Sequence, residues 1–464
     1  MRLVVVGMGY VGAPSAALFA DVEGFQVTGV QRRTRRSGWK IDHMNQGRSP
    51  IGGDEPGLAE LIERVVRRGT LRVTDDTSSY GEADAVLIDV QTPVDSRRVP
   101  IYESLSDVTR DVGREMKRGA MICVESTVAP GTTQNLVKPI LEEESGMRAG
   151  EDFSLVYSYE RVMVGRLLHN LTLMPRVVGG LTPGCAGRGA ELYRKIVKAP
   201  IYETDCLTAE IAKLAENAYR DVNIAFANEV ALICESLGSD VHEVRRYVNS
   251  LPHDPSDSDK NPYRMMMAPG AGVGGHCLPK DTWLLKYGVD AYGSKQLTPW
   301  VMVSSRAIND RMPLHMLSLI KDGLEENGVD LEAARVAILG YAFLENSDDT
   351  RNSPAYPLYR GLEGACGEVV VHDPHVREEA GINLTSDLSA APEGKDCIAL
   401  VTKHREYYGI DLGWLKQQMR TPIIVDGRNV FDPAAAERAG FAFRAVGVGR
   451  RRSMVEAKGS TEAY

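Results

Sequence analysis

The chain of 464 residues has few features that would tie it to a membrane, a metal or an oxidising compartment. Its seven cysteines are an odd number without a Cys-x-x-Cys pair, which argues against a disulfide framework or a zinc ribbon and favours a reducing cytoplasm. No apolar run reaches transmembrane length, and the N-terminus has the pattern of a strand, not of a signal peptide. The net charge of -9 gives no basic excess, so we expect neither nucleic acid nor a membrane surface as a partner.

Two local patterns could suggest otherwise, and both have simpler interpretations. His372 and His375 lie at a strand end in His-Asp-Pro-His, which is more typical of a turn than of a metal site, so we expect no metal. The arginine-rich stretches 32–36 and 450–452 are short, and we interpret them as the rim of a cofactor site and as a solvated tail.

The N-terminus carries a dinucleotide-binding pattern. A short apolar strand runs into Gly7-x-Gly9-x-x-Gly12, followed by an apolar helical stretch at 13–20 and a second strand at 26–30. The first glycine allows a tight turn, the second lets a pyrophosphate approach the backbone, and the third lets helix and strand pack closely. The helix N-terminus would offer N–H groups to phosphate. The alternative is a glycine-rich turn of another α/β protein.

A second glycine-rich loop carries a thiol. The stretch from Pro269 to Asp281 contains one cysteine, Cys277, with Lys280 and Asp281 directly behind it. Its glycines give the backbone unusual freedom and let a ligand approach: Gly270, Gly272, Gly274 and Gly275. A lysine beside a thiol favours the nucleophilic thiolate. A surface turn with a buried, inert cysteine is the alternative, but the combination favours a nucleophile loop.

The pattern of elements predicts two α/β lobes. In the first lobe, 85–90, 121–125 and 155–157 read as buried parallel strands. The stretch Thr208–Leu237 lacks Pro and Gly, has apolar residues at helical spacing, and predicts a long helix closed by Gly238.

A second strand-to-glycine turn opens the other lobe. It begins at 335–340, and further strands are expected at 367–374, 397–402 and 423–426. The fold class is therefore α/β, with two Rossmann-like, doubly wound parallel-sheet domains joined by a central helical domain that contains one long helix.

Polar residues at three further places suggest chemistry. Lys213 and Asn217 lie four apart, so they share a helix face and could donate to one developing oxyanion; the alternative is two solvated side chains. Residues 125–133 and 157–161 leave strands with hydroxyls, a carboxylate and a guanidinium, a usual place for a site in such a sheet. Residues 348–353 could hold phosphate or cap a helix.

Together these residues resemble the UDP-glucose/GDP-mannose dehydrogenase family over nearly the whole chain. Its landmarks occur in the expected order, which is more specific than any single motif: GMGYVG, Gln91-Thr-Pro, ESTVAPGTT, Glu160-Arg161, Lys213 with Asn217, GVGGHCLPKD, DDTRNSP and VHDP. The resemblance implies an NAD-binding domain at 1–195, a central helical dimerisation domain at 196–315 that carries the nucleophile loop, and a UDP-binding domain at 316–464 with a disordered tail after about residue 448. It also implies a homodimer and a UDP-sugar substrate.

The implied activity is a four-electron oxidation of a sugar C6 alcohol to a carboxylate with two NAD in succession. By this resemblance Cys277 attacks the intermediate aldehyde and carries the thioester, while Lys213 and Asn217 steady the oxyanion. Asp281 and Thr127 would position or activate water, and Glu160 would serve in thioester hydrolysis.

The resemblance also implies two sets of binding residues. The cofactor would contact Gly7, Gly9, Tyr10, Val11, Gly12, Arg32, Thr92, Thr127 and Arg351. The substrate would contact Glu160, Arg161, Lys213, Asn217, Arg220, Arg264 and Gly274.

Three features favour one branch of the family. Arg220-Asp221 on the long helix, His276 before the cysteine, and Pro262-Tyr-Arg264 look like the UDP-N-acetylhexosamine dehydrogenases. The expected substrate is UDP-N-acetylmannosamine or its gluco or galacto epimer, with UDP-glucose as the alternative.

The chain departs from the family at two positions. Gln31 stands where an acidic residue normally meets the adenosine ribose, and Arg32 and Arg33 follow it. NAD is the expected cofactor, and NADP stays open. Leu344 stands where most members have a lysine for the UDP pyrophosphate.

Two other classes of function remain as alternatives. A two-electron hydroxyacid-type dehydrogenase would share the N-terminal lobe and the long helix, but needs neither the cysteine loop nor a second lobe. A non-enzymatic nucleotide sensor would not need Lys213, Asn217, Cys277 and Asp281 together. The three classes differ in the NAD(P)H formed per sugar.

Overall fold

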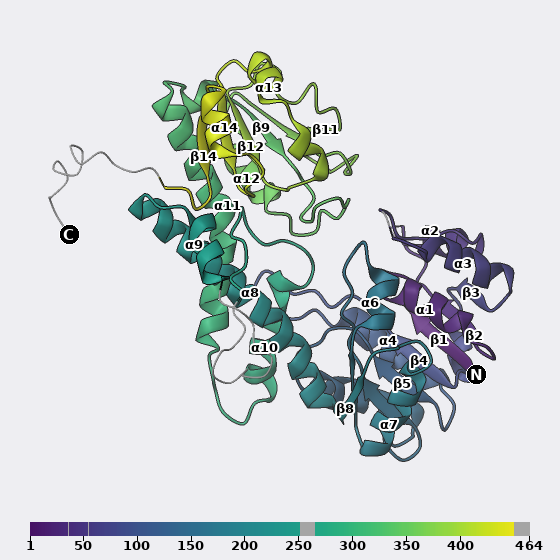
Figure 1. Ribbon diagram of the computed structural model, residues 1–464. Coiled ribbons are helices and arrows are strands. Elements are labelled where there is room, and N and C mark those ends of the chain that lie inside the picture. The colour runs from purple at the N-terminus through teal and green to yellow at the C-terminus, as the bar shows by residue number, and fades with distance from the viewer. Residues whose placement is uncertain (36, 54, 251–264, 450–464) are drawn as a thin grey trace. The chain divides into compact units, whose positions relative to one another are not determined.

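The computed structural model describes residues 1–35, 37–53, 55–250 and 265–449 (Figure 1). The substrate contact expected of Arg264 and nearly all of the expected tail lie outside these ranges. The chain forms two compact units: the first is Met1–Asn217 with Lys280–Pro299, and the second is Ala218–Pro279 with Trp300–Tyr464. Among the described residues, no helix combines the length and the apolar character that crossing a membrane requires.

An eight-stranded sheet forms the centre of the first unit, in the order β3-β2-β1-β4-β5-β6-β7-β8. Its strands are β1 (Arg2–Val6), β2 (Gln26–Val30), β3 (Leu71–Thr74), β4 (Ala85–Ile88), β5 (Met121–Val124), β6 (Ser154–Tyr157), β7 (Arg176–Gly180) and β8 (Ile201–Asp205). The helical segments around it are α1 (Gly12–Asp21), α2 (Trp39–Asn45), α3 (Leu58–Arg67), η1 (Thr77–Glu82), α4 (Glu103–Glu115), η2 (Thr133–Val137), α5 (Lys138–Ser145), α6 (Leu167–Leu173) and α7 (Pro183–Tyr193). The strand order reverses between β1 and β4, which makes their carboxyl ends the place where such sheets bind ligands.

Both faces of this sheet are buried, which explains its continuous apolar strands. Val5 and Leu87 belong to one core with residues of α1 and α3, whereas Val4 and Val86 belong to another with residues of α4 and α5. A strand covered on both sides needs no polar alternation, so the apolar runs of the sequence predicted these strands correctly.

The second unit contains a six-stranded sheet in the order β11-β10-β9-β12-β13-β14, with every neighbouring pair parallel. Its strands are β9 (Arg335–Leu339), β10 (Glu368–His372), β11 (Leu384–Thr385), β12 (Cys397–Leu400), β13 (Ile423–Asp426) and β14 (Ala442–Ala445). Its helical segments are η4 (Leu331–Ala333), α12 (Ala355–Leu362), η5 (Arg405–Gly409), α13 (Leu412–Gln418) and α14 (Pro433–Arg438). The switch point lies between β9 and β12, so the predicted fold class is confirmed in both lobes.

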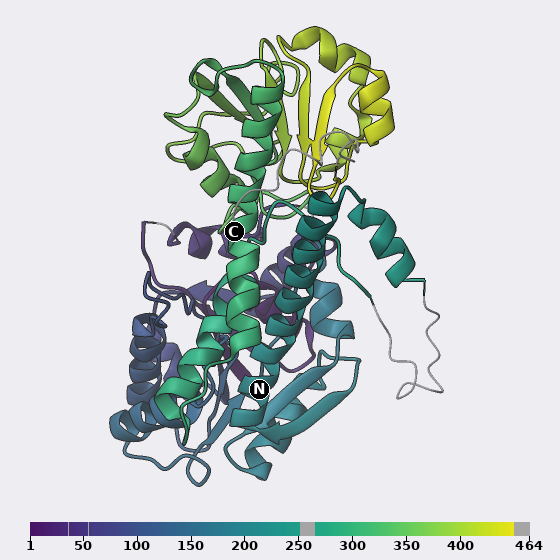
Figure 2. The same cartoon turned by 90° about the vertical axis from the view of Figure 1, so that its left-hand side faces the viewer.

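Four helices lie between the two sheets in the sequence: α8 (Cys206–Leu237), α9 (Val241–Val248), α10 (Leu278–Tyr292) and α11 (Trp300–Glu326). Helix α8 is the long helix that the sequence predicted, and it ends before Gly238, whose φ is +72°. In the second unit, the part of α8 from Ala218 onward lies beside α11 (Figures 1 and 2). Arg306 of α11 reaches Asp221 of α8 at 2.7 Å, and both side chains are buried.

Strand β7 is a feature that the sequence analysis did not predict. It pairs antiparallel with β6 and parallel with β8, so the last two strands run against the rest of the sheet. The segment Arg176-Val-Val-Gly-Gly180 is short and apolar, and nothing in such a pattern states the direction of pairing.

Glu210 fastens α8 to the turn after β5. Its buried carboxylate accepts the backbone N–H groups of Gly131 at 2.6 Å and Thr133 at 2.8 Å. Burial raises the pKa of Glu210 to about 7, although these hydrogen bonds oppose the shift.

We expect this carboxyl to make stability pH-dependent. The pKa of Glu210 in the folded state lies above the ordinary value of 4.5. The protonated carboxyl therefore stabilises the fold fully below pH 4.5, and this stabilisation is lost as the pH rises through about 7. The loss amounts to roughly 3 kcal/mol. Glu210→Gln cannot ionise and should show a smaller fall in Tm than the parent between about pH 5 and about pH 8. Glu229→Gln, at an exposed position of the same helix, should follow the parent. Equal falls in the parent and Glu210→Gln would contradict the expectation.

Candidate active site

The glycine-rich turn after β1 has the geometry that its sequence requires. Gly7 has φ +96°, and a Cβ there would lie 2.2 Å from the carbonyl oxygen of Asp89. A Cβ on Gly12 would lie 1.9 Å from the carbonyl oxygen of Gly7, whereas one on Gly9 would meet nothing within 4 Å. Gly9 therefore faces open space, as close approach of a ligand to the backbone requires.

Helix α1 begins at this turn. No side chain of the described residues caps its N-terminus. The N–H groups of Ala13 and Ser15 donate to the carbonyl oxygens of Gly9 and Val11 at 3.1 Å and 3.0 Å, and Pro14 has no N–H, so a phosphate would meet the turn that precedes these residues. Tyr10 and Val11 complete the turn and are partly buried, with Tyr10 packed against the core under α1. The residues present fit a bound dinucleotide.

Gln31 holds the glycine turn from the neighbouring strand. Its Oε1 accepts the N–H of Met8 at 2.9 Å, and its Nε2 donates to Ser37 Oγ at 3.1 Å. Gln31, which stands in place of the usual acidic ribose contact, therefore stabilises the glycine turn through hydrogen bonds.

The arginines that follow Gln31 face carboxylates. Arg32 lies 3.4 Å from Asp107, and Arg33 lies 3.0 Å from Asp75 and 3.5 Å from Asp42. The hydrogen bond and charge of Asp75 raise the pKa of Arg33. These carboxylates offset the positive charge that a 2′-phosphate would need, which favours NAD over NADP.

Two of the residues expected to contact the cofactor meet at adjacent strand ends. The Oγ1 of Thr92, beyond β4, donates to the carbonyl oxygen of Thr127, beyond β5, at 2.6 Å. Ser126 donates to the carbonyl oxygen of Val90 at 2.8 Å and so joins the same two segments. Hydrogen bonds therefore join the segments that follow β4 and β5 at the carboxyl edge of the sheet.

A buried cluster of charges lies beneath this edge, and the sequence analysis missed it. Arg176 forms an ion pair with Glu125 and donates to Ser158 Oγ at 2.8 Å, while Tyr193 donates to Glu125 at 2.6 Å. Burial and the neighbouring Glu125 carboxylate raise the pKa of Asp89. The sequence shows a carboxyl group directly after each of two apolar strands, Asp89 after β4 and Glu125 after β5, and this pattern could have indicated the cluster.

Lys213 is buried, with 4% of its surface exposed, which excludes the alternative of a solvated side chain. Its ammonium donates to the carbonyl oxygen of Glu160 at 2.8 Å and lies 3.7 Å from the Glu160 carboxylate. It also lies 5.4 Å from the centre of the Tyr159 ring. The strand end after β6 and helix α8 thus bring two expected catalytic residues together.

Asn217 and Asp281 form a second pair in the first unit. The Asn217 amide donates to Asp281 at 2.6 Å, and the Lys280 ammonium donates to the other oxygen of Asp281 at 2.8 Å. Lys280 and Asp281 are both buried. The lysine expected to favour the thiolate of Cys277 is therefore engaged with a carboxylate.

Cys277 lies at the end of a constrained loop in the second unit. All seven cysteines are described, and Cys277 alone is exposed, so it is not the inert buried thiol of the alternative interpretation. Gly272 and Gly275 have φ of +137° and +87°, which other residues rarely adopt. A Cβ on Gly274 would lie 2.5 Å from the Cβ of Phe343.

The arginines expected at the site have defined surroundings. In the first unit, the Nε of Arg161 donates to the Glu216 carboxylate at 2.8 Å and 3.0 Å. In the second unit, Arg351 donates to Asp349 at 2.8 Å, and Arg220 is exposed on α8.

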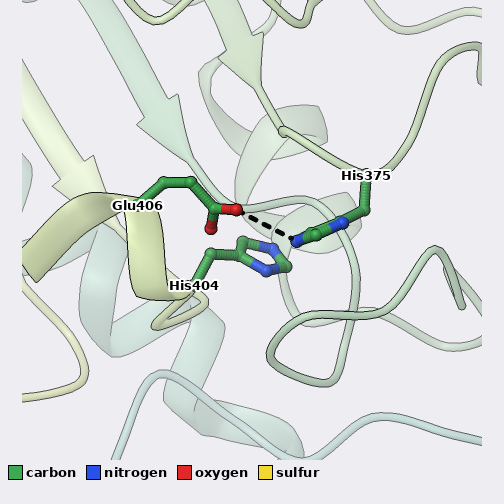
Figure 3. Close-up of side chains that lie close together, drawn as sticks. All are labelled: His375, His404 and Glu406. Carbon is green, nitrogen blue, oxygen red and sulfur yellow. Dashed lines mark ion pairs between the residues drawn. The ribbon is translucent and has the colours of Figure 1, made fainter. Parts of the chain in front are cut away.

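A cluster of His375, His404 and Glu406 has the residue types of a metal site (Figure 3). The His375 ring lies 3.6 Å from the Glu406 carboxylate. However, His404 already uses both ring nitrogens: Nδ1 accepts the N–H of Asn346 at 2.9 Å, and Nε2 contacts Asp373 at 3.0 Å. The central histidine has no free lone pair for a cation, so these residues do not fit a metal.

Three parts of the chain match models of one family. Residues 1–197 match the UDP-glucose/GDP-mannose dehydrogenase family NAD binding domain, residues 207–311 its central domain, and residues 337–433 its UDP binding domain.

Relatives match over nearly the full length. A UDP-N-acetyl-D-mannosamine dehydrogenase of Pyrococcus horikoshii is 36% identical over 97% of this chain and 100% of its own, and a solved UDP-D-ManNAc dehydrogenase structure from that organism, with the same coverage, has a TM-score of 0.87. The NDP-N-acetyl-D-galactosaminuronic acid dehydrogenase of Methanosarcina mazei is 40% identical, with 97% and 95% coverage and a TM-score of 0.85. A UDP-glucose dehydrogenase of Pyrobaculum islandicum is 28% identical, with 97% and 98% coverage and a TM-score of 0.82.

These matches confirm the resemblance and the NAD cofactor that the sequence predicted. The first lobe is an NAD-binding domain, and the protein is an NAD-dependent nucleotide-sugar dehydrogenase. The chain belongs to the UDP-glucose/GDP-mannose dehydrogenase family.

Proposed function

We propose that the chain is a UDP-N-acetylhexosamine 6-dehydrogenase, which oxidises the sugar C6 alcohol to a carboxylate with two NAD per sugar. The observation that carries this proposal is the exposed thiol of Cys277 in a glycine loop of a nucleotide-sugar dehydrogenase. A two-electron alcohol oxidation needs no such nucleophile, whereas an oxidation that continues from the aldehyde to the acid gains from a covalent intermediate.

The relatives and the loop both support an acetamido sugar. Two solved relatives named for N-acetylhexosamine substrates are 36% and 40% identical to the chain, against 28% for one named for UDP-glucose. His276 before the cysteine and Arg220-Asp221 on α8 favour the same branch. The proposed substrate is UDP-N-acetylmannosamine or its gluco or galacto epimer.

The cofactor would lie along the carboxyl edge of the first sheet. The turn that contains Gly7, Gly9 and Gly12 and leads into α1 would hold the pyrophosphate, and Thr92 and Thr127 would line the edge beyond it. Tyr10, Val11, Arg32 and Arg351 complete the proposed set. When bound, NAD supplies the hydride acceptor.

The chain's own residues supply the covalent chemistry. Cys277 adds to the aldehyde carbon as a thiolate, and oxidation of the resulting thiohemiacetal gives a thioester that water cleaves to the acid. Lys213 and Asn217 would steady the oxyanion, and the burial of Lys213 strengthens such an interaction because water is excluded. Asp281 and Thr127 would position water, and Glu160 would assist hydrolysis.

The proposed contacts to the nucleotide-sugar are those that the resemblance implies: Glu160, Arg161, Lys213, Asn217, Arg220, Arg264 and Gly274. Leu344 leaves the diphosphate without the lysine that is usual in the family.

We propose that the chain acts as a homodimer in the cytoplasm, with an NAD-binding domain at 1–195, a dimerisation domain at 196–315 and a UDP-binding domain at 316–464. Four large apolar side chains form an exposed row on α8: Tyr219 is 73% exposed, Phe226 55%, Ile233 50% and Leu237 77%. Their spacing of seven, seven and four places them on one helix face, a pattern that supports burial against a second copy. Seven cysteines without a disulfide fit a reducing compartment.

Product stoichiometry tests the proposed reaction. With UDP-N-acetylmannosamine, its two epimers and UDP-glucose as substrates, we expect two NADH per sugar and the highest kcat/KM for an acetamido sugar. Cys277→Ser should form no acid because an alcohol is a poor nucleophile without an activating base, and it should still bind nucleotide. One NADH per sugar, or full acid production by Cys277→Ser, would reject the thioester route. A preference for UDP-glucose would reject the branch.

Oligomeric state tests the helical interface. We expect Phe226→Glu to shift the protein from dimer to monomer in sedimentation velocity, since a buried carboxylate at an apolar contact is costly. Ser236→Glu adds the same charge at an exposed position of α8 outside the apolar row and should leave the dimer intact. An unchanged dimer in Phe226→Glu would place the interface elsewhere.

Cofactor choice tests the strand end at Gln31. Gln31→Glu keeps the length needed to accept the Met8 N–H and adds a negative charge, so we expect the ratio of kcat/KM for NAD over NADP to rise. Gln31→Asp adds the same charge on a shorter side chain and should also weaken NAD binding, because the loop loses its hydrogen bond. If neither variant changes the ratio, this strand end does not face the ribose.

A further inference from the structure

The nucleophile loop is attached to the second sheet through an arginine far away in the sequence. Arg428 follows β13, and its Nε donates to the carbonyl oxygen of Val401, beyond β12, at 2.7 Å. Its Nη2 donates to the carbonyl oxygen of Gly272 at 3.0 Å. Next to it, the N–H of Ala271 donates to the carbonyl oxygen of Gly427 at 3.0 Å. One guanidinium therefore links the loop to two strand ends of the sheet.

The absence of side chains permits this attachment. A Cβ on Gly270 would lie 2.4 Å from Nη1 of Arg428. A Cβ on Gly427 would lie 2.8 Å from the Cβ of Ala271. The two segments pack backbone to backbone, and the guanidinium lies against Gly270, so this part of the loop cannot move without breaking the contacts.

A second attachment lies nearer the thiol. The amide of Asn352 donates to the carbonyl oxygen of Gly275 at 3.0 Å, and the N–H of Gly275 donates to the carbonyl oxygen of Arg351 at 2.8 Å. Asn352 has φ +50°, the left-handed region that asparagine tolerates better than most residues. Because Gly275 is two residues from Cys277, at most about 7 Å of extended backbone separates this anchor from the thiol.

We propose that Arg428 and Asn352 are positioning residues that hold the loop of Cys277 at the carboxyl edge of the second sheet. The carboxyl edge of such a sheet is where ligands bind, so the nucleotide lobe fixes the reacting thiol through its own strand ends. The proposal rests on the proposed function for the role of Cys277. It assigns Arg428 and Asn352 an effect through the loop, without direct contact to the reacting atoms.

Charge and position predict different effects at Arg428. If the guanidinium acts only as a positive charge for the diphosphate, lysine should replace it and losses should appear in KM. If the guanidinium instead holds the loop by donating to the carbonyl oxygens of both Val401 and Gly272, lysine cannot make both hydrogen bonds in the same geometry, and kcat should fall.

The test is a set of three variants, measured for steady-state kinetics and for amide hydrogen exchange of the loop. For Arg428→Lys and Asn352→Gly we expect kcat to fall on the order of tenfold to a hundredfold, with KM for the UDP-sugar within about twofold. Loop amides should exchange roughly fivefold faster, as loss of one hydrogen bond implies. Asn352→Gly removes the amide donor and keeps the positive φ accessible, so it tests the second anchor without backbone strain.

Arg420→Lys is the matched control. Arg420 donates to Asp396 at 2.8 Å before β12, at the amino end of the same sheet, and should leave the loop and kcat unchanged. A raised KM with normal kcat and normal exchange in Arg428→Lys would make Arg428 a charge contact and overturn the proposal, as would unchanged kcat and exchange in Asn352→Gly. Amide hydrogen exchange is measured on the free enzyme and does not depend on the reaction. It therefore still tests whether Arg428 and Asn352 hold the loop, even if Cys277→Ser shows that the thioester route is wrong.

Discussion

Both units depend on a tight turn directly after the strand that comes first in the chain, which is β1 in the first sheet and β9 in the second. Gly7 and Gly340 have φ of +96° and +91°, and a side chain from the end of the adjacent strand accepts the N–H groups that each turn exposes. Gln31 has this role in the first unit, and Asp373 has it in the second. Burial opposes ionisation of Asp373, yet hydrogen bonds from His404 and the backbone lower its pKa to about 2. A permanent carboxylate therefore occupies the second turn, whereas a neutral amide occupies the first. The same strand order serves different ligands.

Helix α8 is fixed in rotation by polar groups that it buries. Glu210 meets the turn after β5, Lys213 meets the end of β6, Asp221 meets α11, and Asn228 accepts the N–H of Gly270 in the nucleophile loop at 2.9 Å. Each group is costly to bury without its partner, so in each unit the polar groups fix which face of that part of α8 is buried. A purely apolar helix could slide by a turn and keep its burial. This helix cannot.

The sequence predicted what local pattern determines. The apolar runs predicted the strands, because both faces of the sheet are buried. The absence of Pro and Gly from a long stretch with helical spacing predicted α8. Partners distant in the sequence could not be predicted: Arg428 reaches Gly272 across 156 residues, and Arg306 reaches Asp221 across 85. The motifs of the candidate site were recognisable because their chemistry needs fixed residue types. The pairing of Lys213 with Glu160 could not be read, since it depends on how β6 and α8 pack. The roles of these residues remain predictions.

The exposure of a single thiol has a consequence for the enzyme outside its reaction cycle. Five of the other six cysteines are buried and Cys366 is partly buried, so an oxidant in solution reaches Cys277 first. Oxidation to a sulfenic acid would remove the proposed nucleophile and leave both cores intact, and a cellular reductant could restore it. An enzyme inactivated in this way keeps its fold. Its loss of turnover under peroxide would therefore be reversible as long as the sulfur stays below the sulfinic state.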